Sequence, residues 1–262
     1  MIKKLAVLLL LYPLSSLAAD LTDVNEIINR ANNAAFYTAN DGRAVTRMTI
    51  VDSQGRKQLR QFTILRRDIE DGGDQNYLVY FTRPSDIKKT MFLVHKLPGK
   101  EDDRWLYLPG LDLVKRIASG DNRTSFVGSH FFYEDISGRD LDADTHTLTQ
   151  TDETFYVVKN IPKNPASVEF SQYTVWIDKN SMIPIKTEYK DEKGEVYRRV
   201  ETLKTEIIGG FNTATKMKAS NLRNNSYTIN EMRFIQYNLG VPENIFIERS
   251  LRTPPIKWLK RR

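Results

Sequence analysis

Residues 183–203 read IPIKTEYKDEKGEVYRRVETL and contain the clearest hairpin signal in the chain. Ile183, Ile185 and Tyr189 fall on one face at a period of two, which is typical of a half-buried strand. The sequence Asp191-Glu192-Lys193-Gly194 is a turn signal, and residues 196–203 form the returning strand. The stretch therefore predicts a β-hairpin with strands near 183–189 and 196–203.

The same alternation continues in both directions along the chain. Upstream, residues 44–52 and 57–67 flank the turn Ser53-Gln54-Gly55, and further short alternating segments follow. Downstream, residues 213–220 and 226–237 repeat the pattern. Tight turns with few helices between strands indicate an antiparallel meander of about 10–11 strands. Because long open sheets curl, we expect one closed or half-closed barrel.

Three segments depart from this pattern. Residues 21–35 place apolar side chains three and four positions apart, which predicts an N-terminal helix capped by Asp20 or Thr22. Residues 121–140 mix aromatic residues with glycine, serine and acids, so we expect a loop with a short helix near 131–136. Pro242 is placed to begin a short terminal helix.

The N-terminus has the features of a targeting signal. Lys3 and Lys4 precede an apolar run at 5–11, which is too short to span a bilayer. Ser16 and Ala18 suit the positions before a signal peptidase cleavage site. We expect residues 1–18 to be a removed signal peptide and 19–262 to form a single domain. In a Gram-negative bacterium, such a chain is an exported, soluble periplasmic protein.

Composition excludes several classes of function. The 262 residues include no cysteine, which rules out disulfides, thiolate metal sites, cysteine nucleophiles and an acylated N-terminal cysteine that would anchor the chain in a membrane. Hydrophobic residues make up 40 % and charged residues 27 %, as in globular proteins. The net charge of +6 is accompanied by no nucleic-acid-binding motif. We therefore expect no nucleic acid among the partners.

Catalytic motifs are weak in this sequence. It has no glycine-rich phosphate loop and no nucleophile elbow. Ser129 and His130 are adjacent, which rarely places two side chains face to face, so a lipid hydrolase is only a weak hypothesis. His130 and Glu134 have the spacing of two metal ligands on one helix face, but no second histidine lies nearby and a surface hydrogen bond is favoured.

A calcium loop also fails. Asp140, Asp142 and Asp144 resemble its first half, but Thr145 replaces the required glycine and Thr151 the final glutamate. We expect no metal, no cofactor and no enzymatic activity.

Aromatic residues give the stronger signal. The chain has 12 Phe, 12 Tyr and 3 Trp, and many alternate along predicted strands. Such residues point inward either to fill a core or to line a hollow that accepts an acyl chain, and the sequence leaves both readings open. The candidate residues for an apolar cavity and its lid are Met48, Ile50, Phe62, Ile64, Tyr77, Val79, Phe81, Trp105, Tyr107, Phe126, Phe131, Phe132 and Tyr133.

An ordered series of motifs carries a family resemblance. The motifs are RWLYLPG at 104–110, KRI at 115–117, FVGS at 126–129 and YEDI at 133–136, followed by the hairpin above and FIERSL at 246–251. The series resembles the outer-membrane lipoprotein-sorting protein family, a LolA-like group of periplasmic proteins. The resemblance spans nearly all of the chain after the signal.

The resemblance implies a fold and a function. The fold would be mainly β, an incomplete antiparallel half-barrel with an N-terminal helix and short lid helices over an apolar cavity. The function would be that of a carrier or chaperone that binds acyl chains of lipoproteins or another lipid. Its partner would be an inner-membrane sorting complex or a resistance-nodulation-division type exporter. A sensor or partner-binding module that regulates a membrane complex is the alternative.

Two segments are candidates for moving or docking parts. Residues 126–136 are expected to form a lid or cavity-mouth element, against the alternative of a packed loop. The C-terminal tail mixes basic residues with tryptophan. A solvated tail is the favoured interpretation, and contact with anionic headgroups or an acidic partner is the alternative. Its candidate contact residues are Lys257, Trp258, Lys260, Arg261 and Arg262.

Overall fold

The computed structural model of the chain describes residues 20–118, 121 and 123–260. Within them, thirteen strands form one antiparallel sheet, in the order β6-β5-β4-β3-β2-β1-β13-β12-β11-β10-β9-β8-β7. Strands adjacent in the sheet are consecutive in sequence except at the centre, where β1 pairs with β13. The strands are β1 (Asp41–Val51), β2 (Lys57–Asp68), β3 (Gln75–Arg83), β4 (Met91–Lys96), β5 (Asp103–Leu108), β6 (Leu113–Arg116), β7 (Asp144–Thr151), β8 (Phe155–Pro162), β9 (Gln172–Asp178), β10 (Pro184–Lys190), β11 (Val196–Ile208), β12 (Phe211–Asn221) and β13 (Ser226–Tyr237).

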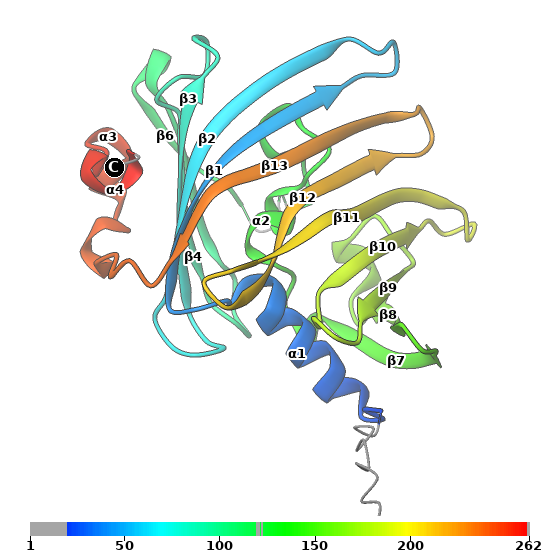
Figure 1. Cartoon of the computed structure of the whole chain (residues 1–262). Coiled ribbons are helices and arrows are strands. Elements are labelled where there is room, and N and C mark those ends of the chain that lie inside the picture. The colour runs from blue at the N-terminus through cyan, green and yellow to red at the C-terminus, as the bar shows by residue number, and fades with distance from the viewer. Residues whose placement is uncertain (1–19, 119–120, 122, 261–262) are drawn as a thin grey trace, which may run out of the picture.

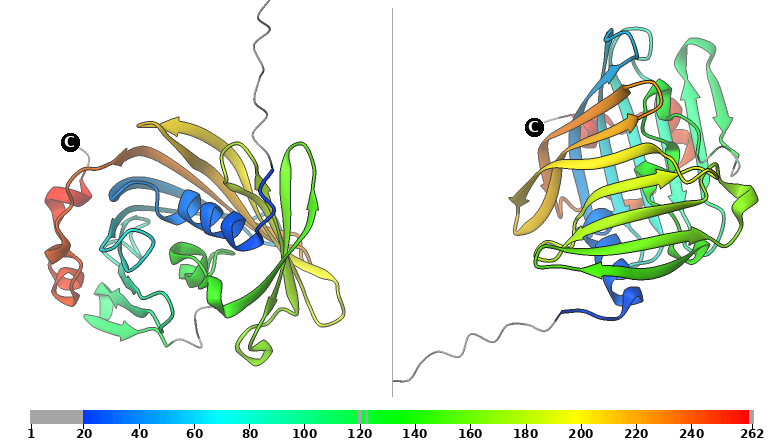
Figure 2. Two further views of the ribbon diagram at one scale, coloured as in Figure 1. Left: turned by 90° about the horizontal axis from the view of Figure 1, so that it is seen from below. Right: turned by 90° about the vertical axis from the view of Figure 1, so that its right-hand side faces the viewer.

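The sheet curves into an open half-barrel (Figure 1). Helices α1 (Val24–Phe36) and α2 (Tyr133–Ser137) lie on its concave side, and α3 (Glu248–Arg252) and α4 (Ile256–Leu259) lie outside it (Figure 2). In the described part of the chain, β6 and β7 are the two edges and do not pair. The predicted mainly-β, incomplete antiparallel barrel with an N-terminal helix is confirmed, with more strands than the expected 10–11.

Helix α1 packs one apolar stripe against the second half of the sheet. Its buried residues Ile27, Ile28 and Ala31 contact a cluster that includes apolar side chains of β8 and β9. The carboxylate of Asp23 caps the helix by accepting a hydrogen bond from the backbone N–H of Asn25 at 2.9 Å. The prediction of Asp20 or Thr22 as the cap was wrong by one to three residues.

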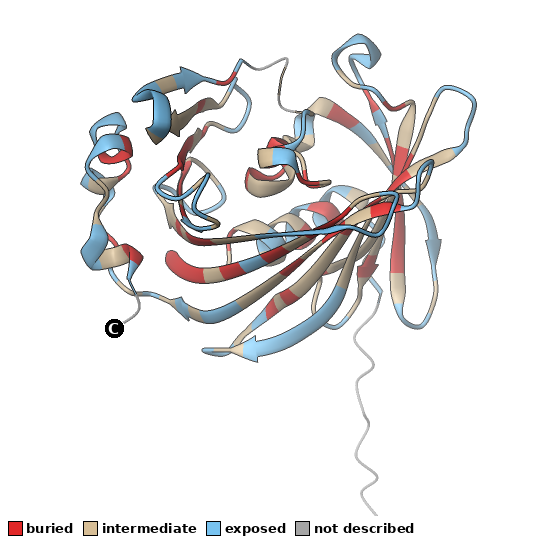
Figure 3. Cartoon of the chain, turned by 90° about the horizontal axis from the view of Figure 1, so that it is seen from above, coloured by how far each residue is buried: buried red, intermediate tan, exposed pale blue. Residues whose placement is uncertain are grey.

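The concave face of β1–β4 is covered by the segment that links β6 to β7. Phe126 in this segment is fully buried, and its ring centroid lies 5.5–6.2 Å from those of Phe62, Phe92 and Tyr133. Figure 3 shows α2 enclosed within the curve of the sheet. The segment predicted as a lid therefore forms an internal plug, with Phe126 packed as core.

The convex face of the same strands has a second core beneath α3 and α4. Leu78 and Leu93 alternate with the concave residues of β3 and β4 and pack with Leu251 of α3. Trp105 and Tyr107 pack against this convex cluster. Register explains their side, because Trp105 pairs with Leu93 whereas the concave Phe92 pairs with Leu106. Their assignment to the concave cavity was therefore wrong.

The C-terminal segment folds back onto β1 and β2. The guanidinium of Arg43 donates to the carbonyl oxygens of Lys260 at 2.7 Å and Trp258 at 3.3 Å. Trp258 is half-buried, whereas Lys257 and Lys260 are exposed. This segment is ordered against the sheet and is not a solvated tail, and its exposed lysines remain candidates for contact with a membrane or partner.

Two further predictions concern the chain ends. The predicted signal peptide at 1–18, together with Arg261 and Arg262, lies outside the described residues. In the described part of the chain, none of the helices combines the length and the apolar character that crossing a bilayer requires.

Candidate functional site

The concave side of the sheet contains a cavity of about 390 Å³. It lies between α1, the α2 segment and both halves of the sheet, and its volume is in the range of small-molecule and cofactor sites. Ala35 of α1 lines the cavity and is also exposed, so the cavity opens to solvent beside this helix.

The walls of the cavity are mainly apolar. One turn of α1 presents the small side chains of Ala31, Ala34 and Ala35, which leave room beside the sheet. The facing strands contribute larger apolar side chains. These are Phe62, Ile64, Tyr77, Val158, Val175, Ile177, Val200, Met217, Met232 and Ile235.

A few polar groups interrupt this apolar surface. Thr46, Thr187 and Thr202 line the cavity from β1, β10 and β11. Asn230 of β13 is buried and also lines it, and its side-chain oxygen accepts no hydrogen bond from any described residue. Because an unsatisfied buried acceptor is costly, this oxygen is suited to accept a hydrogen bond from a bound ligand.

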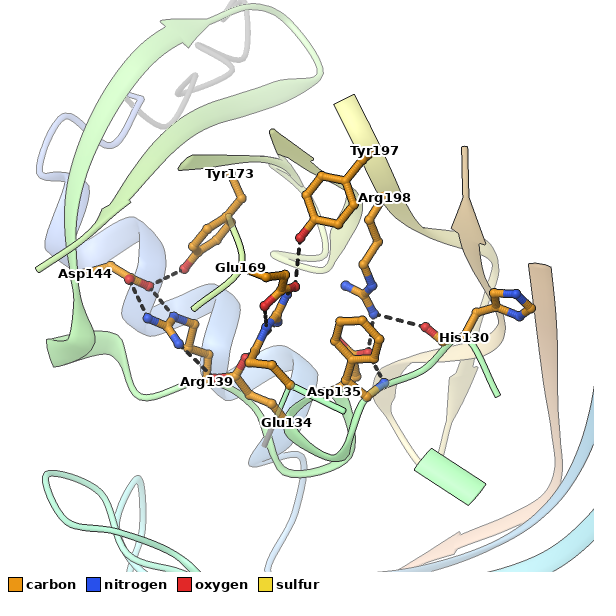
Figure 4. Close-up of polar contacts among 11 residues, drawn as sticks. His130, Glu134, Asp135, Arg139, Asp144, Glu169, Tyr173, Tyr197 and Arg198 are labelled. Carbon is orange, nitrogen blue, oxygen red and sulfur yellow. Dashed lines mark hydrogen bonds and ion pairs between the residues drawn. The ribbon is translucent and has the colours of Figure 1, made fainter. Parts of the chain in front are cut away.

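Ion pairs made by two buried arginines attach the α2 segment to the second half of the sheet (Figure 4). Arg123 bridges Glu134 of α2, at 2.8 Å, and Glu169, at 2.6 Å. Arg198 of β11 pairs with Asp135 of α2. The guanidinium carbons of Arg123 and Arg198 also lie over the ring of Phe132, at 4.9 and 4.2 Å from its centroid. Phe132 is therefore part of this attachment and does not line the cavity.

A second link joins the end of α2 to β7. Arg139 pairs with Glu134 at 2.9 Å and donates two hydrogen bonds to the fully buried carboxylate of Asp144, at 2.7 and 2.8 Å. The hydroxyl of Tyr173 donates a third hydrogen bond to Asp144 at 2.7 Å. Burial and this neighbouring carboxylate raise the pKa of Tyr173, so the phenol stays protonated.

Arg123 determines the direction in which the pKa of Glu169 shifts. Burial by itself would raise the pKa of Glu169, but the hydrogen bonds and the charge of Arg123 outweigh burial and lower it. The carboxylate therefore remains ionised at neutral pH and accepts a further hydrogen bond from the hydroxyl of Tyr197 at 2.7 Å.

The geometry gives no support to a serine–histidine pair. The ring of His130 hydrogen-bonds to the hydroxyls of Thr228, at 2.8 Å, and Ser226, at 2.6 Å. The hydroxyl of Ser129 instead bonds to the backbone of Phe131. Burial and the charge of Arg198 lower the pKa of His130, so its ring is neutral at pH 7. The His130 side chain anchors the α2 segment to β13, whereas Ser129 braces the segment internally.

His130 and Glu134 also have separate partners, because Glu134 is paired with two arginines. Among the described residues, no three His, Asp or Glu side chains are placed to hold a metal ion.

The predicted cavity residues fall into distinct groups. Phe62, Ile64, Tyr77 and Phe131 line the cavity. The others on the concave face pack into the solid core beside it, where they support its wall without lining it. These are Met48, Ile50, Val79, Phe81, Phe126 and Tyr133.

The sequence did not predict that α1 and the second half of the sheet line the large cavity. The small residues of α1 that line the cavity, such as Ala34, lie next to the buried stripe of the helix. Their small size was the only feature of the sequence that pointed to a cavity there. Val175 and Val200 lie in predicted strands, but alternation alone does not show that these strands face β2 across a hollow.

Comparisons with known proteins agree with this architecture. A protein-family model described as an uncharacterized protein matches residues 73–253. No curated protein sequence matches the chain. A crystal structure of a DUF1329 family protein from Desulfovibrio piger is similar, with a TM-score of 0.79 and 26 % identity over 86 % of this chain and 96 % of that one.

Two other solved structures share the fold. A "putative outer membrane lipoprotein-sorting protein domain" from Vibrio parahaemolyticus has a TM-score of 0.77 and 26 % identity, covering 87 % of this chain and 97 % of that one. A LolA superfamily protein from Nitrosomonas europaea has a TM-score of 0.67 and 15 % identity, covering 87 % and 99 %. Since the family model matches more than half of the sequence, the chain belongs to that family of uncharacterized proteins, and its fold is that of LolA-like lipoprotein-sorting proteins.

Proposed function

We propose that this protein is a periplasmic carrier that binds the acyl chains of a lipoprotein or another lipid. The observation that carries the proposal is the apolar cavity enclosed by α1, the α2 segment and both halves of the sheet. The likeness to a domain described as lipoprotein-sorting supports the same reading. We propose further that residues 1–18 are removed on export and that the remainder acts as one domain.

The energetics suit a passive carrier. Each methylene group that leaves water gains about 0.8 kcal/mol, so an acyl chain of about 16 carbons gains on the order of 10 kcal/mol when fully buried. Uptake, shielding and release then need only a donor that binds the chain less tightly and an acceptor that binds it more tightly. An inner-membrane sorting complex or exporter is the proposed donor, and no step requires a cofactor.

A cavity-filling substitution on α1 tests the proposal. Ala34 lines the cavity, whereas its neighbour Asn33 is exposed and does not. In Ala34→Trp the indole occupies space needed by an acyl chain, so we expect binding of a fluorescent fatty-acyl probe to fall about tenfold or more. The matched control Asn33→Trp adds the same side chain outside the cavity and should bind the probe like the wild type.

The outcomes separate ligand binding from folding. Circular dichroism checks that both variants keep the β-sheet spectrum. Equal probe affinity in the wild type, Ala34→Trp and Asn33→Trp would show that the probe binds elsewhere and would refute the cavity as the acyl site. Absence of probe binding by the wild type would refute the carrier function itself.

A further inference from the structure

A second, smaller cavity of about 160 Å³ lies where β4, the loop after it and the end of α2 meet. One water molecule needs roughly 10–15 Å³ of such space, so this cavity has room for a polar group of several heavy atoms. It differs from the large cavity in being lined mainly by charged side chains. These are Lys96, Lys100, Glu101, Asp102, Arg104, Glu134, Arg139 and Asp140.

Lys96 is the distinctive group in this cavity. It ends β4 on the concave side and is only 5 % exposed. Its ammonium nitrogen lies 5.3 Å from the ring centroids of both Phe36 and Tyr37, at the end of α1. Within the described residues this nitrogen forms no hydrogen bond or ion pair, and it packs against the faces of these two rings.

The carboxylates near Lys96 have other partners. Asp102 pairs with Arg104 at 2.6 Å and accepts a hydrogen bond from the N–H of Leu97 at 2.9 Å. Asp140 accepts from the backbone N–H groups of Gly99 and Asp142, at 3.1 and 3.0 Å. These acids influence Lys96 through space without contacting it.

The small cavity adjoins the proposed acyl site. Glu134, Gly138 and Arg139 line both cavities, and Phe36, which contacts Lys96, lines the large one. Gly138 makes this proximity possible, because a Cβ there would lie 3.0 Å from the Phe36 ring and 3.1 Å from the Lys96 nitrogen. A group bound at Lys96 would therefore lie next to an acyl chain in the large cavity.

We propose that the Lys96 cavity binds an oxyanion, a phosphate or carboxylate, at the polar end of the acylated ligand. The inference rests on the proposed carrier function and narrows its cargo to anionic lipids. A charge-assisted hydrogen bond from the ammonium to such an oxygen would supply the partner that the chain does not. Neutral lipids of the same chain length would gain nothing from this group.

Protonation of Lys96 is compatible with this role. Burial lowers its pKa to about 8, while the charges of Asp102 and Asp140 oppose that shift and Arg104 adds to it. The charge of Asp68 has a smaller effect on the pKa of Lys96, with the same sign as that of Asp102. At pH 7 the ammonium form therefore predominates and is available to an anion.

Matched pairs of ligands test the inference. Each pair has the same chains with and without the anion: palmitate against hexadecanol, and dipalmitoyl phosphatidic acid against dipalmitoylglycerol. Displacement of a fluorescent acyl probe at pH 7 gives the affinity of each. We expect the wild type to bind the anionic member at least about tenfold more tightly. Lys96→Met should bind both members alike, and Lys57→Met, which removes an exposed lysine outside both cavities, should retain the preference.

The outcomes distinguish this inference from the proposed function. If the neutral members bind but the wild type shows no preference, or if Lys96→Met keeps it, the anionic-head site is refuted while the carrier function stands. If no member of either pair binds, both the carrier function and the anionic-head site are refuted. Inorganic phosphate binding as tightly as phosphatidic acid would assign the cavity to a free anion and overturn its assignment to a lipid head.

Discussion

At the scale of single residues, Lys96 links stability to pH. Because burial lowers its pKa from 10.5 to about 8, the folded protein releases this proton between pH 8 and 10.5 while the unfolded chain keeps it. The burial cost is therefore fully present below pH 8 and is relieved as pH rises through that interval. The full cost is roughly 3 kcal/mol, at 1.36 kcal/mol per pH unit.

Urea denaturation of Lys96→Met measures this cost. We expect the variant to be more stable than the wild type at pH 7, and its advantage to shrink by about 1 kcal/mol at pH 9. Lys57→Met, at an exposed position, should differ little from the wild type at both pH values. An advantage of Lys96→Met that is independent of pH would contradict the description of Lys96 as a buried ammonium that forms no direct ion pair.

Alternation along a strand predicted which side chains share a face. It was less able to predict whether that face lies on the concave or the convex side of the sheet. The alternation in β2 and β3 correctly grouped Phe62, Ile64 and Tyr77, all of which line the cavity. It failed for Trp105 and Tyr107 because β4 and β5 are apolar on both faces. Only the register with β4, set by the folded sheet, places these two rings on the convex side.

At the scale of elements, the attachment of α2 to β7 depends on one buried carboxylate. Asp144 accepts two hydrogen bonds from Arg139 and one from Tyr173. Asp144→Ala leaves the Arg139 guanidinium with Glu134 as its only carboxylate partner and removes the acceptor of the phenol, so we expect a loss of about 3–5 kcal/mol. Asp142→Ala, two residues away at an exposed site, should change stability by less than about 0.5 kcal/mol.

Chemical denaturation of both variants gives these values. A loss below about 1 kcal/mol for Asp144→Ala would show that the ion pairs contribute little to positioning the α2 segment. In that case, the rates of amide hydrogen exchange in α2 should also be the same in both variants as in the wild type.

Elements with local signals were predicted well, and elements defined by distant contacts were not. The hairpin of 183–203 appears as β10 and β11, and α2 lies within two residues of the predicted short helix. The covering of the convex face by α3 and α4 was not predicted. Each of these helices is no longer than five residues, and their burial depends on β2–β5, more than 130 residues earlier in the chain.

At the scale of the whole molecule, the half-barrel brings together segments that no local pattern connects. Pairing of β1 with β13 joins the two halves of the chain, and the curve of the resulting sheet encloses α1 and α2. Whether its interior is filled or hollow depends on how these pieces pack. In the structure both occur side by side, a solid core around Phe126 and a cavity beside Ala34. The same aromatic residue types serve both, so the sequence left the two readings open.

If the protein is a carrier, the large cavity beside Ala34 holds acyl chains in the cell. Native mass spectrometry of the protein purified from its own compartment, beside the organic extract of the same sample, tests it most directly. We expect a stoichiometric mass increment that disappears on extraction and reappears in the extract as an acylated species with an anionic head. A ligand-free mass, together with no uptake of added fatty-acyl probe, would contradict it.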